Sequence, residues 1–317
     1  MKVLVVGGAG YLGGAVTDLL VQSNHETRVY DSLVYEDSYL KAVDFVYGDI
    51  RDRANLKRHL KWADCVIWLA ALVGDGACAL NPDISTELNH LALAWMAENF
   101  DGRIIFMSTC SVYGAQDGIL DESSPINPLS IYAVTKFAAE AHLKNKNAII
   151  FRLGTLFGLS DRFSRIRLDL VVNTMTAKAH TEGRLSVFGG AQYRPLLHVR
   201  DAAQAVFDNI ETKAKGVYNL HKTNIKMSDL AQEVKKQFPK IKVEKIEMKF
   251  EDARNYRVSS DKAKKIGFSP RLTPTEGIKE LKELLESGRI RDLNSPRYTN
   301  HGFLEQFKTH EGYNGKK

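Results

Sequence analysis

The chain has 317 residues, of which 44% are apolar, with a formal net charge of +6 and a pI of about 9.0. This length predicts about two domains with a sizeable core. The chain has three cysteines, an odd number without metal-ligand spacing. They predict a reduced, cytoplasmic compartment, no disulfides and no metal site. We expect no membrane segment, because no run of about eighteen apolar residues occurs, and no nucleic acid partner, because Lys and Arg are dispersed; an anionic small molecule explains the positive charge equally well.

A glycine-rich turn follows the first predicted strand. Residues 1–6 form a short, β-branched apolar run, and Gly7, Gly10 and Gly13 stand where this strand would turn into a helix. Gly7 allows the tight turn, Gly10 lets the backbone approach a pyrophosphate, and Gly13 lets the helix pack closely while its first N–H groups face the anion. The residues expected to bind a dinucleotide here are Gly7, Gly10, Tyr11, Leu12 and Gly13.

Carboxylates end the next two strands. The strand 27–30 ends on Asp31, which could accept hydrogen bonds from both ribose hydroxyls of an adenosine and would repel a 2′-phosphate, so NAD is favoured over NADP. Residues 44–52 predict a third strand, a turn and a helix start, with Asp49 near an adenine edge and Asp52 as a possible helix cap. The cofactor residues predicted here are Asp31, Ser32, Asp49 and Ile50.

Strand and helix patterns continue to alternate, which predicts an α/β fold with a Rossmann-type, doubly wound parallel sheet. The expected elements are a strand at 64–69, a helix at 84–100, a strand at 103–108, a helix at 130–144 and a strand at 148–152.

The pattern becomes less regular from about residue 160, which predicts a smaller C-terminal substrate domain. Strands at 196–199 and 217–220, with a helix at 201–210, look like a return to the sheet. We therefore expect interleaved domains: residues 1–160 with return segments near 191–222, and residues 161–317.

Tyr132 and Lys136 carry the predicted chemistry. Four residues apart on one helix, the phenol and the ammonium share a face and can point into one site. An adjacent cation, helped by a positive nicotinamide, stabilises a phenolate, so we expect the pKa of Tyr132 to fall below its ordinary value of about 10 and Tyr132 to act as a general base. A hydroxyl at the end of the preceding strand, Thr109 or Ser108, could bond the substrate oxygen that Tyr132 deprotonates.

Together these motifs resemble the extended short-chain dehydrogenases/reductases of the NAD-dependent sugar epimerase/dehydratase family. The matching pieces run in order over roughly the first 200 residues and weakly to about Pro274: Gly7, Gly10 and Gly13, Asp31, Asp49–Ile50, Leu69–Ala70–Ala71, residues 108–114, Tyr132 and Lys136, residues 151–154 and residues 194–201. The resemblance implies NAD in the N-terminal domain and a nucleotide-diphosphate sugar in the cleft below the C-terminal domain.

The resemblance also implies residue roles. Tyr132 would take the proton of a sugar hydroxyl, Lys136 would bind the nicotinamide ribose, and Thr109 would be the helper hydroxyl. Arg194 and Arg254 match arginines that hold the substrate's diphosphate, with a surface ion pair as the alternative for either. Leu69, Ala70, Ala71 and Ser108 complete the expected cofactor site. Helices 84–100 and 130–144 resemble the pair that forms a four-helix bundle in dimeric relatives, so a homodimer is expected.

Departures from the family pattern narrow the reaction. Sugar-nucleotide 4,6-dehydratases carry an Asp-Glu pair just after the threonine, where this chain has Cys110 and Ser111, which we place at the substrate; without the carboxylates, elimination of water lacks its acid and base. Residues 153–158 lack an asparagine that many epimerases offer to the substrate phosphate, and Asn173 either replaces it or is a helix interior residue. The loop 73–78 should cover the sugar.

These observations favour a C4 epimerase of a nucleotide-diphosphate sugar. A keto-sugar reductase or a C3/C5 epimerase is the alternative among enzymes. A catalytically silent, dinucleotide-sensing regulator on the same fold is the alternative from another class, but such a sensor would not need Tyr132, Lys136 and Thr109 together.

Overall fold

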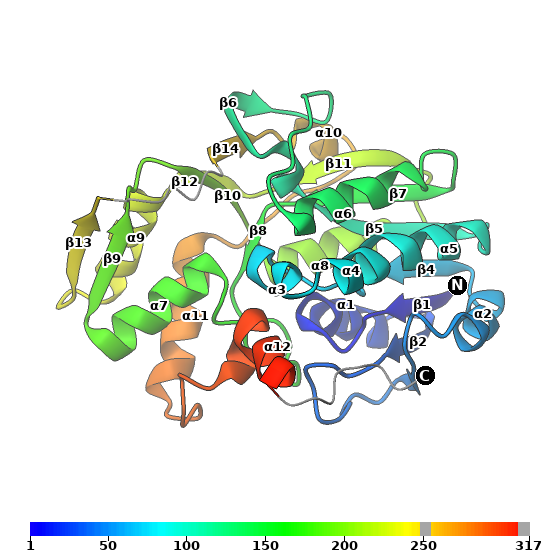
Figure 1. Cartoon of the computed structure of the whole chain (residues 1–317), viewed down its shortest axis with the longest axis horizontal. Helices are drawn as coiled ribbons and strands as arrows, with labels where there is room; N and C mark the ends of the chain where they lie inside the picture. The colour runs from blue at the N-terminus through cyan, green and yellow to red at the C-terminus, as the bar shows by residue number, and fades with distance from the viewer. Residues whose placement is uncertain (248–254, 310–317) are drawn as a thin grey trace.

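The computed structural model describes residues 1–247 and 255–309 of the chain. Its centre is a sheet of seven parallel strands in the order β11-β7-β5-β4-β1-β2-β3, which confirms the predicted Rossmann-type fold (Figure 1). The strands are β1 (Lys2–Val6), β2 (Glu26–Asp31), β3 (Asp44–Tyr47), β4 (Cys65–Trp68), β5 (Arg103–Thr109), β7 (Ala148–Leu153) and β11 (Gly216–Leu220).

Helices cover both faces of this sheet, which explains why β1, β4 and β5 are buried almost along their whole length. On one face, α1 (Tyr11–Val21) and α8 (Val199–Asp208) share a core with alternate strand residues such as Val5 and Ile67. On the other face, α2 (Arg53–Trp62), α5 (Ala92–Glu98) and α6 (Ile131–Ala141) pack on the intervening residues, among them Leu4 and Trp68. Because helices cover both faces of the sheet, a ligand can reach it only at its edges or at the ends of its strands.

The rest of the chain forms a smaller group of elements beside the carboxyl ends of the strands (Figure 1). Three small sheets occur there: β8 (Thr155–Phe157), β10 (Tyr193–His198) and β12 (Thr223–Lys226); β9 (Arg184–Phe188) with β13 (Lys242–Ile246); and β6 (Ala115–Leu120) with β14 (Asn255–Val258). The helices of this group are α7 (Val171–Glu182), α9 (Met227–Gln237), α11 (Pro274–Glu286) and α12 (Asn300–Thr309). The short helix α10 (Asp261–Lys264) packs on β11, and its Ala263 belongs to the core of the central sheet. Phe157, Leu196 and Leu230 lie in the core of this group.

Two expectations from the sequence need correction. The strand predicted at 196–199 does not return to the central sheet: β10 pairs with β8 and β12, because β11 already occupies the free edge of β7 and the chain leaves β7 at Gly154. A Cβ on Gly154 would lie 2.9 Å from the Pro195 carbonyl oxygen, so the close approach of the chain to β10 between β7 and β8 requires glycine. The helix predicted at 84–100 is α4 (Pro82–Thr86), a π-helical turn (Glu87–Leu91) and α5 in succession.

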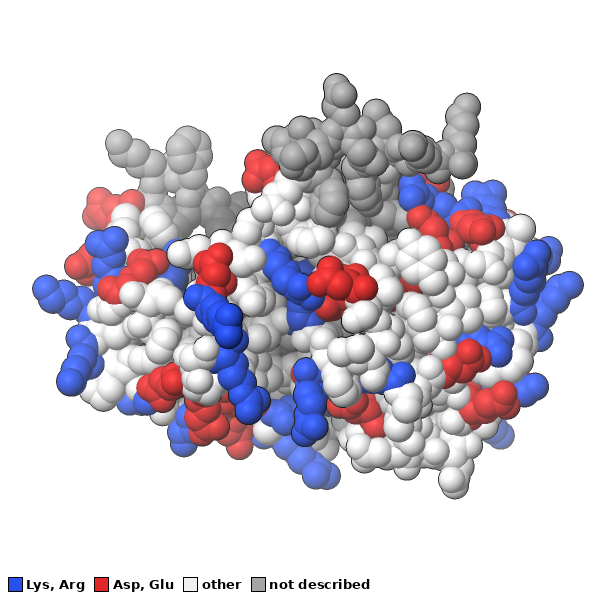
Figure 2. Space-filling view, turned by 90° about the horizontal axis from the view of Figure 1, so that it is seen from below, with Lys and Arg blue, Asp and Glu red and all other residues white. Residues whose placement is uncertain are grey.

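No helix among the described residues is long and apolar enough to cross a membrane. The surface charges are mixed, and on the face shown in Figure 2 the Lys and Arg side chains are interspersed with Asp and Glu. This agrees with the dispersed pattern of basic residues in the sequence.

Candidate active site

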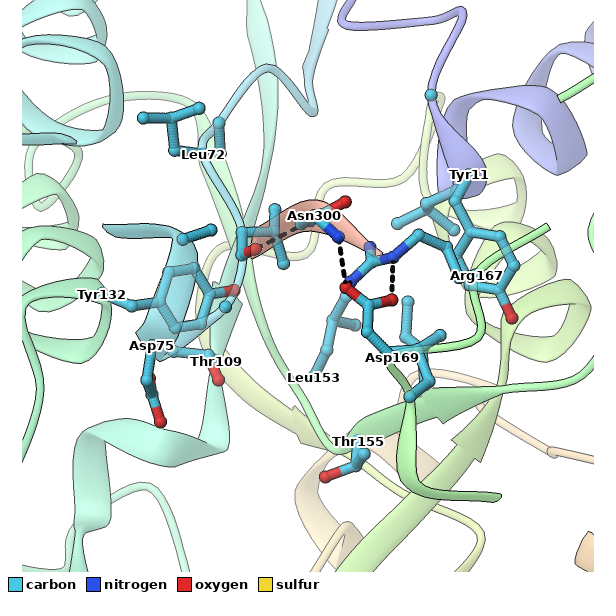
Figure 3. Close-up of a pocket in the computed structure, with 18 of the residues that line it drawn as sticks. Tyr11, Leu72, Asp75, Thr109, Tyr132, Leu153, Thr155, Arg167, Asp169 and Asn300 are labelled. Carbon is cyan, nitrogen blue, oxygen red and sulfur yellow. Dashed lines mark hydrogen bonds and ion pairs between the residues drawn. The ribbon is translucent and has the colours of Figure 1, made fainter. Parts of the chain in front are cut away.

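A cavity of about 1020 Å³ lies at the carboxyl ends of β1, β2, β4, β5 and β7. The segments that follow these strands form one wall, and residues of the smaller group form the other. In an open parallel sheet this is the place where ligands bind. Figure 3 shows Tyr132, Thr109 and Asp75 on one side of the cavity and Tyr11, Arg167 and Asp169 on the other.

The glycine turn fits a pyrophosphate. Gly7 has a φ of +85°, and a Cβ there would lie 2.4 Å from the backbone nitrogen of Ala70. A Cβ on Gly13 would lie 2.6 Å from the Gly7 carbonyl oxygen, whereas one on Gly10 would have only that oxygen nearby, at 3.6 Å. The turn is thus packed tightly on the protein side and open at Gly10, which lines the cavity. No side chain caps α1, so its first N–H groups suit a phosphate.

Asp31 lines the same cavity at the end of β2. Its Oδ2 accepts a hydrogen bond from the Ala9 N–H at 3.0 Å, and its Oδ1 accepts one from the Leu33 N–H at 2.8 Å. Burial raises the pKa of this carboxyl, and these backbone bonds oppose the rise. Because each carboxylate oxygen has a second lone pair, both oxygens can still accept a ribose hydroxyl.

The other predicted cofactor residues also lie along this wall. Leu12, Ser32, Ile50, Leu69, Ala70, Ala71 and Ser108 line the cavity. Asp49 does so as well, but its carboxylate is already paired with Arg51 at 2.6 Å. Burial would raise the pKa of Asp49, and the bonds and charge of Arg51 outweigh that effect and lower it. The structure therefore brings these residues together, and their contacts with a cofactor stay a prediction.

Tyr132 and Lys136 project from α6 into the cavity, as their spacing predicts. The helix begins after Ser130, whose hydroxyl accepts a hydrogen bond from the Ala133 N–H and donates one to Asp75 at 2.7 Å. Tyr132 and Thr109, at the end of β5, lie on the same side of the cavity (Figure 3). The Lys136 Nζ lies 4.1 Å from the centre of the Phe106 ring.

The pKa expectation for Tyr132 is wrong for the protein alone. Burial raises the pKa of the Tyr132 phenol, Cys78 and Asp75 add to the rise, and Arg167 and Thr109 oppose it only in part. Burial also lowers the pKa of Lys136 to about 7, against the opposing charge of Glu140. Burial is thus the largest influence on the pKa of both groups. A further positive charge beside the phenol, such as an oxidised nicotinamide, would lower the pKa of Tyr132.

A buried network fixes the part of the cavity wall that carries Tyr132 and Lys136. Glu140 accepts hydrogen bonds from Arg152 at 3.0 and 2.7 Å and from the Ser108 hydroxyl at 2.5 Å. Arg152 also donates to the Tyr113 hydroxyl at 2.9 Å, which in turn donates to Asn219 at 2.8 Å. The network joins α6 to β5, β7 and β11, so the position of Tyr132 is tied to three strands of the sheet.

Two predicted substrate residues do not lie on the cavity. Cys110 is fully buried, its thiol donates to the Arg152 carbonyl oxygen, and burial raises its pKa. Asn173 is also fully buried, where its amide accepts from the Gly158 N–H and donates to the Arg167 carbonyl oxygen. Both side chains are used by the backbone around them, so their assignment to the substrate is wrong.

The remaining substrate candidates are placed as follows. Thr109, Ser111 and Arg194 line the cavity, and the Ser111 hydroxyl lies 3.3 Å from the Tyr256 hydroxyl. Arg254 is outside the described residues.

The structure adds cavity residues that the sequence analysis did not single out. Arg167 and Asp169 form an ion pair, with Arg167 Nε 2.6 Å from Asp169 Oδ1, and Asp75, Arg165 and Asn300 line the same space. Arg165, Arg167 and Asp169 are charged residues at alternate positions just before α7. This alternation is the sequence pattern that could have identified them. Asn300 had none, because it comes more than a hundred residues after the segments that it contacts.

Comparisons with known proteins agree with this geometry. Residues 3–220 match the model of the NAD dependent epimerase/dehydratase family. The chain is 28% identical over 297 residues to a protein of Methanocaldococcus jannaschii named as a proposed UDP-glucose 4-epimerase, covering 88% of this chain and 96% of the relative. It is also 28% identical over 261 residues to a dTDP-glucose 4,6-dehydratase of Neisseria gonorrhoeae, covering 71% and 75%.

Solved structures show the same fold. The UDP-glucose 4-epimerase of Thermus thermophilus, solved in complex with NAD, superposes with a TM-score of 0.78 at 22% identity, covering 92% of this chain and 100% of that one.

A cofactor prediction follows from the position of Asp31. Replacing Asp31 with Ala should weaken NAD binding by roughly tenfold or more, because hydrogen bonds to a charged group contribute about 1.5–3 kcal/mol. Asp31→Asn keeps an acceptor oxygen for the Ala9 or Leu33 N–H and removes the charge that repels a 2′-phosphate, so it should mainly relax the bias against NADP. Calorimetric titration of each variant with NAD and NADP measures both effects. Tighter binding of NADP than of NAD by the unmodified protein would contradict this assignment of Asp31.

Proposed function

Because the chain belongs to the NAD dependent epimerase/dehydratase family, we propose that it is an epimerase that inverts C4 of a nucleotide-diphosphate sugar. The family uses NAD, and the open glycine turn and the Asp31 carboxylate of this chain fit that cofactor. The observation that carries the proposal is the convergence of Tyr132, Lys136 and Thr109 on a cavity that has no carboxylate directly after Thr109.

Each of these three residues has a task in such a reaction. Bound NAD supplies the hydride acceptor and donor at C4. Tyr132 takes the proton of the C4 hydroxyl and returns it after the sugar has turned. Thr109, on the same side of the cavity as Tyr132 (Figure 3), orients the same hydroxyl, and its own oxygen accepts a hydrogen bond from the Ser111 N–H at 3.1 Å. Lys136 places its amino group on the phenol's face of α6 and can bind the ribose next to the nicotinamide.

The position after Thr109 argues against a dehydratase. Elimination of water from a 4-keto sugar needs a base at C5 and an acid at C6. Cys110 is buried behind the cavity, and Ser111 has no group that could act as either near neutral pH. These two positions therefore lack the groups that the elimination needs.

One observation favours a second candidate function. The carboxylate of Asp75 lies on the same side of the cavity as Tyr132 and Thr109 (Figure 3) and raises the pKa of Tyr132, after burial and Cys78. A carboxylate beside the sugar could take a proton from C3 or C5 of a 4-keto sugar, which is the chemistry of a C3/C5 epimerase. Asp75 also accepts a hydrogen bond from Ser130, so a structural task at the start of α6 explains it equally well.

The fate of carbon-bound hydrogen separates these reactions. If the same hydride leaves and returns at C4, no ring carbon exchanges with water, so product formed in D₂O should carry no carbon-bound deuterium in its NMR spectrum. A C3/C5 epimerase passes through an enolate that takes a proton from solvent. Deuterium at C3 or C5 would reject C4 epimerisation, and its loss in Asp75→Asn would identify Asp75 as the base.

We further propose that the chain forms a homodimer through α5 and α6. The outer face of α6 exposes Val134 and Phe137 at 45% and 38%, opposite the cavity face that carries Tyr132 and Lys136, and Leu91 beside α5 is 46% exposed. Contiguous exposed apolar side chains on a stable helix pair are typical of a protein interface. Two copies of this pair would form a four-helix bundle.

The dimer can be tested by charge insertion. Val134→Glu or Phe137→Glu would bury a carboxylate in the interface, so either variant should be a monomer in light scattering coupled to size-exclusion chromatography, while the unmodified chain is a dimer. Val21→Glu is the matched control, since Val21 is 50% exposed on α1, on the other face of the sheet. A monomeric unmodified chain, or dimers in both α6 variants, would reject this interface.

A further inference from the structure

A C-terminal segment crosses the cavity between the two halves of the molecule. We call residues 296–306 the strap; they comprise a short 3₁₀ turn, η3 (Pro296–Tyr298), and the first two turns of α12. In Figure 1 α12 (red) lies between α11 and the N-terminal elements. It packs against α3 (Asp75–Leu80), the short helix after β4.

The strap is bound to the cofactor half at two loops. Arg297 forms ion pairs with Asp37 at 2.8 Å and Glu36 at 3.5 Å, in the loop that follows Asp31 and β2. The Asn300 amide donates to the Val73 carbonyl oxygen at 2.7 Å, in the loop after β4. The strap thus joins the loop expected beside the adenosine to the loop expected above the sugar.

The strap is also bound to the opposite half. The Asn300 N–H donates to Asp169 at 2.8 Å, and the Leu168 N–H donates to the Tyr298 carbonyl oxygen at 2.8 Å. Arg165 donates to the Arg297 carbonyl oxygen at 2.7 Å and to the Asn300 amide oxygen. Every one of these bonds spans more than a hundred residues of chain, so the strap is a tertiary crosslink between the walls of the cavity.

Asn300 is the centre of this crosslink. It is 3% exposed and lines the same cavity as the glycine turn and Asp31. Figure 3 shows its side chain between the Tyr132 side and the Arg167–Asp169 pair. Its neighbour His301 also lines the cavity and packs against Gly76, where a Cβ would lie 3.1 Å from the His301 ring. A molecule that fills the cavity therefore has the strap as part of its wall.

We propose that the strap is a clasp that retains NAD, and that Asn300 is the residue that fastens it. The use of such a clasp rests on the proposed epimerisation, which is redox-neutral, so the enzyme has no need to release its cofactor between turnovers. Asn300 contributes most to the clasp, because its buried amide joins Val73 to Arg165. Opening the clasp would leave buried hydrogen-bonding groups unpaired, which costs free energy. The Arg297 pairs, with 43% of that side chain exposed, contribute less.

The test is the rate at which NAD leaves the loaded protein. After removal of free NAD by rapid desalting, the NAD that remains bound is measured over time with no sugar present. Asn300→Ala should release NAD at least about tenfold faster, which corresponds to about 1.4 kcal/mol. Asn300→Asp keeps the acceptor for Arg165 but loses the donor to Val73, so it should also release NAD faster. Arg289→Ala is the control, because Arg289 is exposed and precedes the strap.

The outcomes separate the clasp from the proposed function. Release rates equal to that of the unmodified protein in both folded Asn300 variants would overturn the clasp, as would equal acceleration in Arg289→Ala. If neither Asn300 variant folds, Arg297→Ala takes their place, with a smaller acceleration expected, and an unchanged rate rejects the clasp. Because no sugar is present, these results do not depend on which reaction the enzyme catalyses, and the D₂O result does not depend on the strap.

Discussion

The part of the cavity wall that carries Tyr132 and Lys136 depends on one buried ion pair, between Glu140 and Arg152. Both residues are nearly inaccessible, at 6% and 4% exposed, and removal of either charge would leave the other unpaired in the core, at a cost of roughly 3–5 kcal/mol. Glu140 lies four residues after Lys136 and eight after Tyr132, so the anchor, the cation and the phenol share one face of α6. Since Glu140 also holds Ser108, which precedes Thr109, the same carboxylate fixes the helix and the strand end that the reaction needs together.

The electrostatics of the site depend on a charge that the chain does not itself supply. Burial raises the pKa of Tyr132 and lowers that of Lys136 to about 7, so proximity alone does not prepare the base. Arg167 pairs with Asp169. Glu36 accepts a hydrogen bond from the backbone N–H of Arg165, and its charge, with those of Tyr35 and Asp169, opposes the lowering of the Arg165 pKa that burial and Arg167 cause. An oxidised nicotinamide would bring a positive charge close to the phenol. In the proposed reaction, deprotonation of the substrate by Tyr132 would therefore depend on bound NAD.

The sequence predicted those features of the site that depend on residues close together in the chain. The turn at Gly7, the carboxylate at Asp31 and the Tyr132–Lys136 face follow from backbone sterics and helix geometry, and the structure brings them to one cavity. Cys110 and Asn173 were misplaced because burial of a small polar side chain depends on distant partners: the carbonyl oxygens that bind them belong to β7 and to the segment before α7. The return of β11 to the sheet was expected correctly, but β10 was assigned to the wrong sheet, because an apolar pattern predicts a strand without identifying its partners, which are β8 and β12. The strap could not be predicted, since its contacts join residues far apart in sequence and Asn300 carries no motif.

If Tyr132 is the general base of an otherwise preformed site, as we propose, Tyr132→Phe tests this role most directly. This change removes one oxygen and leaves the ring, the α6 anchor and the cofactor wall in place. Turnover of the nucleotide sugar should fall by about 10²–10⁴-fold, while thermal stability and NAD affinity, measured on the same preparation, stay close to those of the unmodified protein. A variant that folds, binds NAD and turns over at nearly the full rate would contradict this role and leave Tyr132 as a packing residue.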